Sequence, residues 1–392
     1  MKNIIGSPAR GKDFYQRKRE VEKIISSLSN GNNLQITAPR RVGKTSILWY
    51  LLDNDFPNRH YIYVDTESIS DEQSFYKRLL AAVLKNERVS TSSKLLGGFV
   101  NGVNRFFRRI NSVQVLSASV EFNQPEAARD YYDEFFDFLM GYTQVEDTEL
   151  VLLIDEFPQV IENMSKKGEE GAIAFLQRKR ALRLDPEINQ KVKFIYTGSI
   201  GLNHTVSRLG ATATINDLNS IEIGALTDEE AIDLFEQLLA PYKRVVKEEG
   251  KEKLLEMIQY HIPFHIQLLV QEAVRLTPEG GEITAAAMEQ GMDHMIVLRN
   301  QNHFDHYFSR LKEQFKEQVF KYVDELLKEI AKKDMMTRVG VFDMAVKYSL
   351  QDGYRSIIES LMYDGYIHYI GSLEQYQFTS PVVKRWWIKF IC

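Results

Sequence analysis

Residues 38–45 (APRRVGKT) carry the residue types and the spacing that bind a polyphosphate. They follow an apolar run at 34–37 (LQIT), and an apolar stretch with helical character comes after them. A loop between a buried strand and a helix offers backbone N–H groups at the positive end of the helix dipole, which suits phosphate groups. In this loop Gly43 permits close backbone approach, Lys44 can bridge the β- and γ-phosphates, and Thr45 can offer its hydroxyl to Mg²⁺.

One position of the loop departs from the usual pattern, because Ala38 stands where glycine is common. The loop tolerates alanine there if the residue has a negative φ. The alternative is a chance Gly-Lys-Thr at a helix start, and the strand before it and the helix after it argue against that alternative. The expected nucleotide contacts of the loop are Pro39, Arg40, Arg41, Val42, Gly43, Lys44, Thr45 and Ser46.

A second apolar run, 150–154 (LVLLI), ends in Asp155 and Glu156. The carboxyl ends of parallel strands meet at one edge of a sheet, so both acids are expected in the same crevice as the loop. There Asp155 would hold Mg²⁺, and Glu156 would orient or deprotonate an attacking water. With Lys44 they form the expected catalytic set, and Thr45 and Asp155 form the expected metal site. The alternative is an ordinary strand that ends in solvated acids.

A third run, 192–197 (VKFIYT), ends in Thr197 and leads into Gly198 and Ser199. The two hydroxyls would lie near the γ-phosphate and could report its hydrolysis. A strand followed by a simple glycine turn explains the same residues equally well. Ser199 is therefore a candidate nucleotide contact.

Hydrolysis would be completed by an arginine from a neighbouring molecule that neutralises charge in the transition state. Each candidate fits a solvated surface arginine better than this role. The candidates are Arg178, Arg180, Arg183 and Arg208.

These apolar runs, together with 61–64 (YIYV), alternate with helical stretches over the first two hundred residues. Continuous apolar runs are typical of parallel strands covered on both faces, so the pattern predicts an α/β P-loop NTPase core with a parallel sheet covered by helices. This core spans 1–226 and contains an insertion at about 88–130. Within the insertion, 95–109 is apolar with a basic end and is expected to be packed or mobile, while 112–122 alternates like an extra strand or hairpin.

From Thr227 onward the pattern is helical. Thr227 and Glu230 predict a capping box that opens an amphipathic helix, and a helical lid domain is expected over 227–302. The remainder, 303–392, reads as helices at about 310–331, 339–348 and 354–363, followed by strands at 366–370 and 376–379. Helices followed by a two-stranded wing predict a C-terminal winged helix.

The bulk properties exclude several classes of protein. The 392 residues include one cysteine, Cys392, so a disulfide framework or a thiolate zinc site within one chain is excluded. The formal net charge of −5 gives no general field for nucleic acid. There is no run of about 18 apolar residues and no apolar start like a signal peptide, so we expect a cytoplasmic protein without a transmembrane segment.

Taken together, the motifs resemble those of the STAND and archaeal-type ATPases of the AAA+-like P-loop class. Phe14 and Arg17 match the family's entry motif, which lies against the adenine, although Gln16 replaces its usual glycine. The stretch APRRVGKTS is similar to its phosphate loop, and Thr-Gly-Ser at 197–199 to its third motif. Pro263 matches the lid segment, so the resemblance assigns Phe14, Arg17 and Pro263 to the nucleotide site.

The resemblance implies an ATP- and ADP-dependent switch with Mg²⁺ and slow hydrolysis, acting in signalling, defence or regulation through a protein partner or self-association. The alternative is a DNA-binding ATPase similar to archaeal replication initiators, with the winged helix on the duplex. Residues 303–392 hold 13 Lys and Arg against 12 Asp and Glu, a balance of +1. That balance is a poor match to a polyanion, so DNA is the less favoured partner. His261 and His265 flank Pro263 and are expected to be structural or near the nucleotide, not metal ligands.

Overall fold

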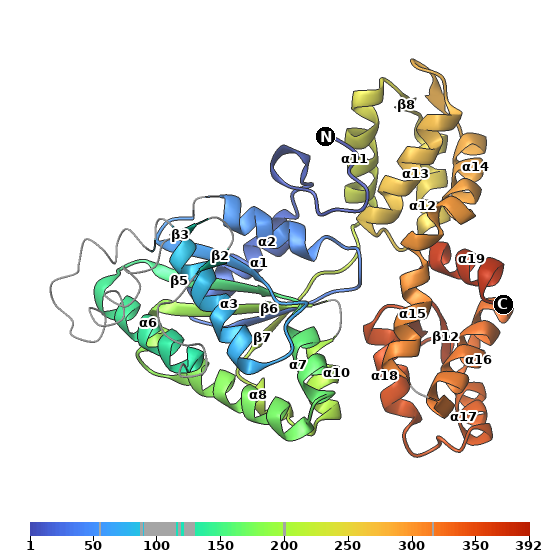
Figure 1. The fold of residues 1–392 in the computed structure, drawn as a ribbon. Coiled ribbons are helices and arrows are strands. Elements are labelled where there is room, and N and C mark those ends of the chain that lie inside the picture. Colours follow the sequence, from blue (N-terminus) through green and yellow to red (C-terminus); the bar gives the residue numbers. More distant parts are fainter. Residues whose placement is uncertain are drawn as a thin grey trace. The chain divides into compact units, whose positions relative to one another are not determined.

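The computed structural model describes residues 1–54, 56–86, 89, 115–116, 119–120, 130–198, 201–315 and 317–392 (Figure 1). They fall into two compact units. The sheet unit comprises 16–37 and 44–223, and the helical unit comprises 1–15, 38–43 and 224–392. The loop 38–43 thus groups with the C-terminal part of the chain. The three-domain division drawn from the sequence remains a prediction.

The sheet unit is built on five strands in the order β2-β5-β6-β1-β7, and every neighbouring pair is parallel. The strands are β1 (Leu34–Thr37), β2 (Arg59–Asp65), β5 (Glu149–Asp155), β6 (Val192–Thr197) and β7 (Asn219–Glu222). The predicted α/β class and its four strands are confirmed. Strand β7 was not predicted, because this edge strand has one apolar residue, Ile221, in the run NSIE.

Helices cover both faces of the sheet (Figure 1). On one face, α7 and α8 contact aromatic rings of β6, and α3 packs on α7 and α8. On the other face, α2 meets β2. Leu150 to Ile154 of β5 have no exposed surface, as burial on both faces requires. The helices are α1 (Lys18–Ser29), α2 (Lys44–Asp53), α3 (Glu72–Lys85), α6 (Tyr131–Val145), α7 (Phe157–Ser165), α8 (Glu169–Leu184), α9 (Ile188–Lys191) and α10 (Leu202–Arg208).

The predicted insertion is described only in part. Residues 115–116 and 119–120 form the antiparallel pair β3 (Val115–Leu116) and β4 (Ser119–Val120), which confirms the hairpin expected within 112–122. The apolar stretch 95–109 lies outside the described residues.

The C-terminal part of the helical unit begins after β7, and its first helix is α11 (Asp228–Leu239). The predicted capping box of α11 is present: the Thr227 side chain accepts from the amide of Glu230, and the Glu230 side chain accepts from the amide of Thr227. Three further helices follow: α12 (Glu248–Ile258), α13 (Pro263–Leu276) and α14 (Ala285–Met295). A short parallel pair, β8 (Val245–Val246) and β9 (Glu282–Ile283), interrupts the helical pattern that the sequence predicted.

The last ninety residues contain five helices and a three-stranded antiparallel sheet in the order β10-β12-β11. The predicted single helix at about 310–331 is two helices, because the backbone at Phe315 is extended. The final helix was not predicted, and it buries Trp386 and Trp387 completely. The elements are α15 (Asp305–Gln314), α16 (Glu317–Lys333), β10 (Met336–Thr337), α17 (Arg338–Lys347), α18 (Tyr354–Tyr363), β11 (Ile367–Ile370), β12 (Gln375–Phe378) and α19 (Pro381–Phe390). Within the described ranges, no helix is both long enough and apolar enough to span a bilayer.

Candidate nucleotide-binding site

The loop 38–43 joins the end of β1 to the start of α2. Two of its residues have left-handed backbone conformations, Arg41 with φ 69° and Gly43 with φ 97°, and Val42 between them does not. Such alternation turns successive backbone N–H groups toward one concave face, which binds anions. A Cβ at Gly43 would meet no atom within 4 Å, so the φ angle, not lack of space, demands glycine. The loop therefore has the backbone alternation of an anion cradle, and its role as the phosphate site remains a prediction.

The cradle leads directly into the first turn of α2. Lys44 and Ser46 lie in that turn and are 8 % and 6 % exposed. Ile47, Leu48 and Leu51 of the same helix have no exposed surface, so the core of the sheet unit fixes the helix start. The first N–H groups of a helix have no partner within the helix. In α2 these groups and the ammonium of Lys44 thus belong to a well-packed helix start, as phosphate binding requires.

The carboxylate of Asp155 lies at the end of β5 and is 3 % exposed. Its Oδ2 accepts hydrogen bonds from the hydroxyls of Thr45 at 2.8 Å and Tyr63 at 3.1 Å. Its Oδ1 accepts from the hydroxyl of Thr197 and, at 3.1 Å, from the backbone N–H of Glu156. Because β6 lies between β1 and β5, Thr197 ends its strand beside Asp155. The structure therefore brings together Thr45, Asp155 and Thr197, which the sequence singled out separately.

Thr45 and Asp155 are a suitable donor set for Mg²⁺. Hydroxyl and carboxylate oxygens are hard ligands, and Mg²⁺ is usually held by one or two carboxylates together with substrate phosphates. Among the described residues, no group of three or more His, Cys, Asp or Glu could hold a metal by itself. A metal at this position would accordingly depend on phosphate oxygens to complete its shell.

Glu156 follows in the left-handed conformation, with φ 58° and ψ 31°, at the N-cap of α7. A non-glycine residue held there costs on the order of 1–3 kcal/mol, and such strain gathers at functional sites. Phe157 and Pro158 begin the helix and are buried, so packing fixes the turn. Glu156 is half-buried while Asp155 is enclosed, so the two acids have separate environments.

The side chains of the loop arginines lie in the helical unit. The guanidinium carbon of Arg41 is 4.2 Å from the ring centroid of Phe264, in the first turn of α13. Burial, and then the neighbouring charge of Arg40, lowers the pKa of Arg41. Burial, with the charges of Arg40 and Arg41 next, also lowers the pKa of His306 to about 2, so this imidazole is neutral. Pro39 lies beside Gly365, where an added Cβ would be 3.4 Å from the Cβ of Pro39.

The structure says less about four other predicted nucleotide contacts. Phe14 is 8 % exposed, and Arg17 is buried with its guanidinium 3.1 Å from Glu20. Pro263 is the first residue of α13, where its missing N–H costs nothing. Ser199 lies outside the described residues. The roles of these four residues at the nucleotide remain predictions.

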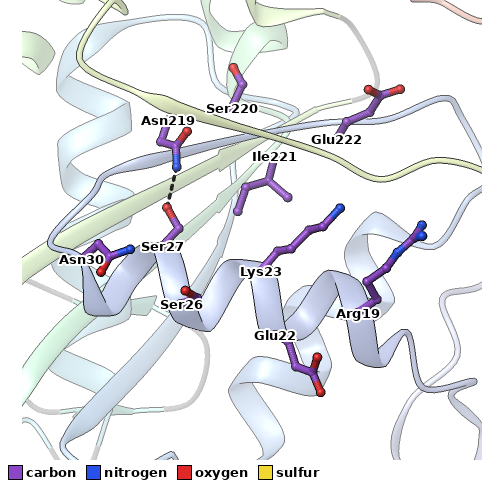
Figure 2. A pocket seen from close by; sticks show the side chains of 10 residues that line it. All are labelled: Arg19, Glu22, Lys23, Ser26, Ser27, Asn30, Asn219, Ser220, Ile221 and Glu222. Atoms are coloured by element: carbon purple, nitrogen blue, oxygen red, sulfur yellow. Dashed lines mark hydrogen bonds between the residues drawn. The ribbon is translucent and has the colours of Figure 1, made fainter.

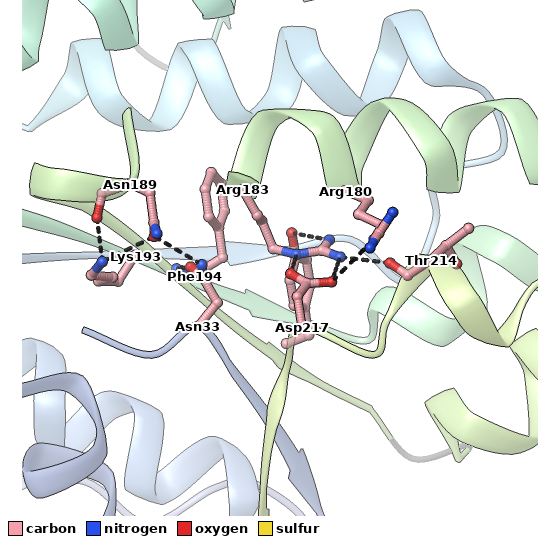
Figure 3. A network of polar contacts seen from close by, with 9 residues as sticks. Asn33, Arg180, Arg183, Asn189, Lys193, Phe194, Thr214 and Asp217 are labelled. Carbon is pink, nitrogen blue, oxygen red and sulfur yellow. Dashed lines mark hydrogen bonds and ion pairs between the residues drawn. The ribbon is translucent and has the colours of Figure 1, made fainter. Parts of the chain in front are cut away.

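The expectation that all four candidate arginines are solvated is wrong for Arg183. Its side chain is 1 % exposed, and it donates to Asp217 at 2.7 and 2.9 Å and to the carbonyl of Thr214 at 2.6 Å (Figure 3). It therefore stabilises the sheet unit and cannot reach another molecule. The other three are partly exposed and lie beside acids of the sheet unit: Arg178 with Glu72, Arg180 with Asp217 and Arg208 with Glu162.

A separate hollow of about 580 Å³ lies along α1 and the edge strand β7 (Figure 2). Its lining is polar apart from Ile221 and mixes the cations Arg19 and Lys23 with the acids Glu22 and Glu222. Small-molecule sites are mostly apolar with a few placed polar groups. None of the residues that the sequence assigns to the nucleotide lines this hollow.

Sequence reasoning missed Tyr63 and Thr66. Thr66 donates to the carbonyl of Asp155 from its hydroxyl at 2.7 Å and from its amide at 3.1 Å. The feature that reveals their role is the parallel register of β2 and β5. It pairs Asp65 with Asp155 and so brings the end of β2 to the carboxylate. A tyrosine inside an apolar run is typical of a core residue, so the sequence does not predict a functional hydroxyl there.

Comparisons with solved structures show proteins of similar fold. A Walker-type ATPase of Pyrococcus abyssi is 17 % identical, with a TM-score of 0.64, and the match covers 98 % of this chain and 99 % of that one. The ORC2 protein of Aeropyrum pernix, solved in ADPNP and ADP complexes, is 11 % identical with a TM-score of 0.51, over 100 % and 95 %. No family model and no curated protein matches the chain. At these identities the likeness shows the fold, which is that of Walker-type ATPases with a C-terminal helical region.

Proposed function

We propose that this chain binds ATP and ADP with Mg²⁺, hydrolyses ATP slowly, and works as a regulatory switch of the STAND kind. Two observations carry the proposal: the backbone alternation at Arg41 to Gly43, which leads along the chain into Lys44, and the hydrogen bond between Thr45 and Asp155. A polyphosphate and a hard cation are the ligands that this combination of groups fits.

Each side chain has a distinct role in the proposed reaction. Lys44 binds the β- and γ-phosphates, and Thr45 and Asp155 hold the metal. Bound Mg²⁺ would neutralise charge that develops on the phosphates. Thr197 keeps Oδ1 of Asp155 occupied, so that Oδ2 remains directed at Thr45. Glu156, outside the enclosed pocket of Asp155, orients or deprotonates the attacking water.

The switch requires a residue that interacts with both the phosphates and the helical unit. This follows because a ligand shifts a conformational equilibrium only if it binds the two conformations of the protein with unequal affinity. Arg41 meets this requirement. Its backbone shapes the cradle and its guanidinium contacts Phe264 on α13. Phosphate bound at the backbone would change the charge around the guanidinium, and hence the packing of α13.

A protein partner or a second copy of the chain is the favoured target of the switch. On α17, Val339, Phe342 and Val346 are 68 %, 40 % and 49 % exposed, and their spacing places them on one face. In α18, one arginine and one glutamate balance each other. Exposed apolar side chains suit a protein surface, and a balanced charge does not suit a phosphate backbone.

The test is a pair of variants with separable phenotypes. Lys44→Ala should weaken ATP binding by about 10- to 100-fold, because a charge-assisted hydrogen bond contributes about 1.5–3 kcal/mol. Glu156→Gln should keep wild-type affinity and lose about 100-fold or more in turnover. Calorimetry with Mg²⁺ measures the first effect and phosphate release the second.

Matched controls use exposed residues of the same unit, Lys166→Ala and Glu169→Gln. Both should behave as wild type. Equal ATP affinity in Lys44→Ala and wild type would overturn the site assignment. Undiminished turnover in Glu156→Gln would remove its catalytic role and leave the binding site in place.

A further inference from the structure

Tyr63 is an Asp155 partner that the reaction scheme above does not use. Its hydroxyl is 3.1 Å from Oδ2 of Asp155, the same oxygen that accepts from Thr45 at 2.8 Å. The phenol and the threonine hydroxyl therefore converge on one carboxylate oxygen. Tyr63 belongs to β2, whereas Thr45 belongs to α2.

The surroundings of Tyr63 hold its ring in one place. Parallel pairing sets the residue beside Leu153 of β5, two positions before the carboxylate. Its ring meets Trp49 of α2 edge to face, with centroids 6.3 Å apart and an interplanar angle of 75°. Immediately after β2, Thr66 is tied to the carbonyl of Asp155 by two hydrogen bonds. The donor is consequently fixed by elements on both sides of it.

A carboxylate rotates about its Cβ–Cγ bond, so a ligand oxygen must be held if it is to meet a metal at one angle. The hydroxyl of Thr197 and the amide of Glu156 hold Oδ1 of Asp155. Thr45 cannot hold Oδ2 in the same way, because its hydroxyl would turn to the metal. Among the described residues, Tyr63 is then the donor left on Oδ2. Donors behind a metal ligand orient that ligand.

We propose that Tyr63 is a positioning residue for the Mg²⁺ site, which orients Oδ2 of Asp155 toward the metal that Thr45 shares. The inference rests on the proposed function, since it concerns the same nucleotide site. It assigns Tyr63 no direct contact with nucleotide. Loss of the hydroxyl should therefore change the metal dependence of the site and spare the phosphate cradle.

Tyr63→Phe tests this by removing one oxygen and keeping the ring that packs on Trp49. Calorimetric titration with ADP is done in EDTA and over a series of Mg²⁺ concentrations. We expect the variant to match wild type in EDTA and to need about 10-fold more Mg²⁺ to reach its tight-binding state, the effect of one hydrogen bond to a charged group. In turnover, the Mg²⁺ concentration at half-maximal rate should rise by a similar factor, with the maximal rate less affected.

Tyr61→Phe is the control, because Tyr61 lies on the same strand and the same face but two residues further from the carboxylate edge. It should show wild-type Mg²⁺ dependence. Equal Mg²⁺ dependence in Tyr63→Phe and Tyr61→Phe would overturn the positioning role while leaving the proposed function standing. Failure of the wild type itself to bind ADP or ATP, with or without Mg²⁺, would overturn the proposed function and this inference with it.

Discussion

Lys179 on α8 has no exposed surface, and its ammonium nitrogen lies between 4.5 and 5.8 Å from the centroids of four aromatic rings. The rings are those of Phe75, Tyr76, Phe194 and Tyr196. Among the residues that the structure describes, Nζ has no hydrogen-bond partner. Burial, and then the charge of Arg183, lowers the pKa of Lys179 well below that of a free lysine. Contacts with ring faces offset only part of the cost of burying this group.

We therefore expect Lys179→Met to raise the free energy of unfolding by about 1–3 kcal/mol near pH 7, because methionine fills the space without a group to desolvate. The folded-state pKa lies below the unfolded value, so between the two the unfolded wild type binds more protons, and wild-type stability rises with pH. The advantage of the variant should thus shrink between about pH 7 and about pH 9. Urea unfolding at both pH values measures it.

The exposed Lys166→Met serves as the control for that series and should leave the unfolding midpoint unchanged. A Lys179→Met variant less stable than wild type would mean that the ring contacts outweigh the burial cost. A gap that widens with pH would contradict the direction of the pKa shift.

At the scale of elements, the strands with continuous apolar runs were predictable, and β7 was not, because an edge strand needs only one apolar face. The phosphate loop was predictable because its function demands local residue types in fixed spacing. The contact of Arg41 with Phe264 was not, since nothing in either sequence segment indicates the other. Tyr63 was hidden for a related reason: only the strand register brings its hydroxyl to Asp155.

In the proposed switch, the first turn of α13 is the element that moves. Pro263 fixes the backbone entry to this helix, directly before Phe264. Pro263→Gly should loosen the entry while leaving the cradle intact, because glycine adds conformational freedom and changes no phosphate contact. We expect weaker ADP retention. Limited proteolysis of the helical unit should be slowed by ADP in wild type and become insensitive to ADP in the variant.

Pro381→Gly is the matched control, because Pro381 holds the same first-residue position in α19. ADP should still protect that variant. If ADP leaves wild-type cleavage unchanged, and ATP does too, nucleotide binding is not coupled to the helical unit, and the chain is a static ATP-binding module.

At the scale of the whole molecule, charge separates the two candidate functions. The chain carries 49 Lys and Arg against 54 Asp and Glu, and its last ninety residues are nearly balanced. Duplex binding at physiological salt depends on neutralising several phosphates with basic side chains. We expect the full-length chain to form no submicromolar complex with duplex DNA in a gel-shift assay, with or without ATP. A tight complex that weakens steeply with added salt would favour the initiator-like alternative.

The strand order has a consequence for how the chain is made. β1 leaves the ribosome long before β6 and β7, its neighbours in the sheet, so Leu34 must find Ile195 on one side and Asn219 on the other. Closing loops of this length before any pairing is gained slows folding. During synthesis the apolar β1 therefore stays unpaired until residues 192–222 have emerged. A nascent chain that stalls before that point exposes an unsatisfied strand, the kind of surface that molecular chaperones bind and that aggregates when they do not.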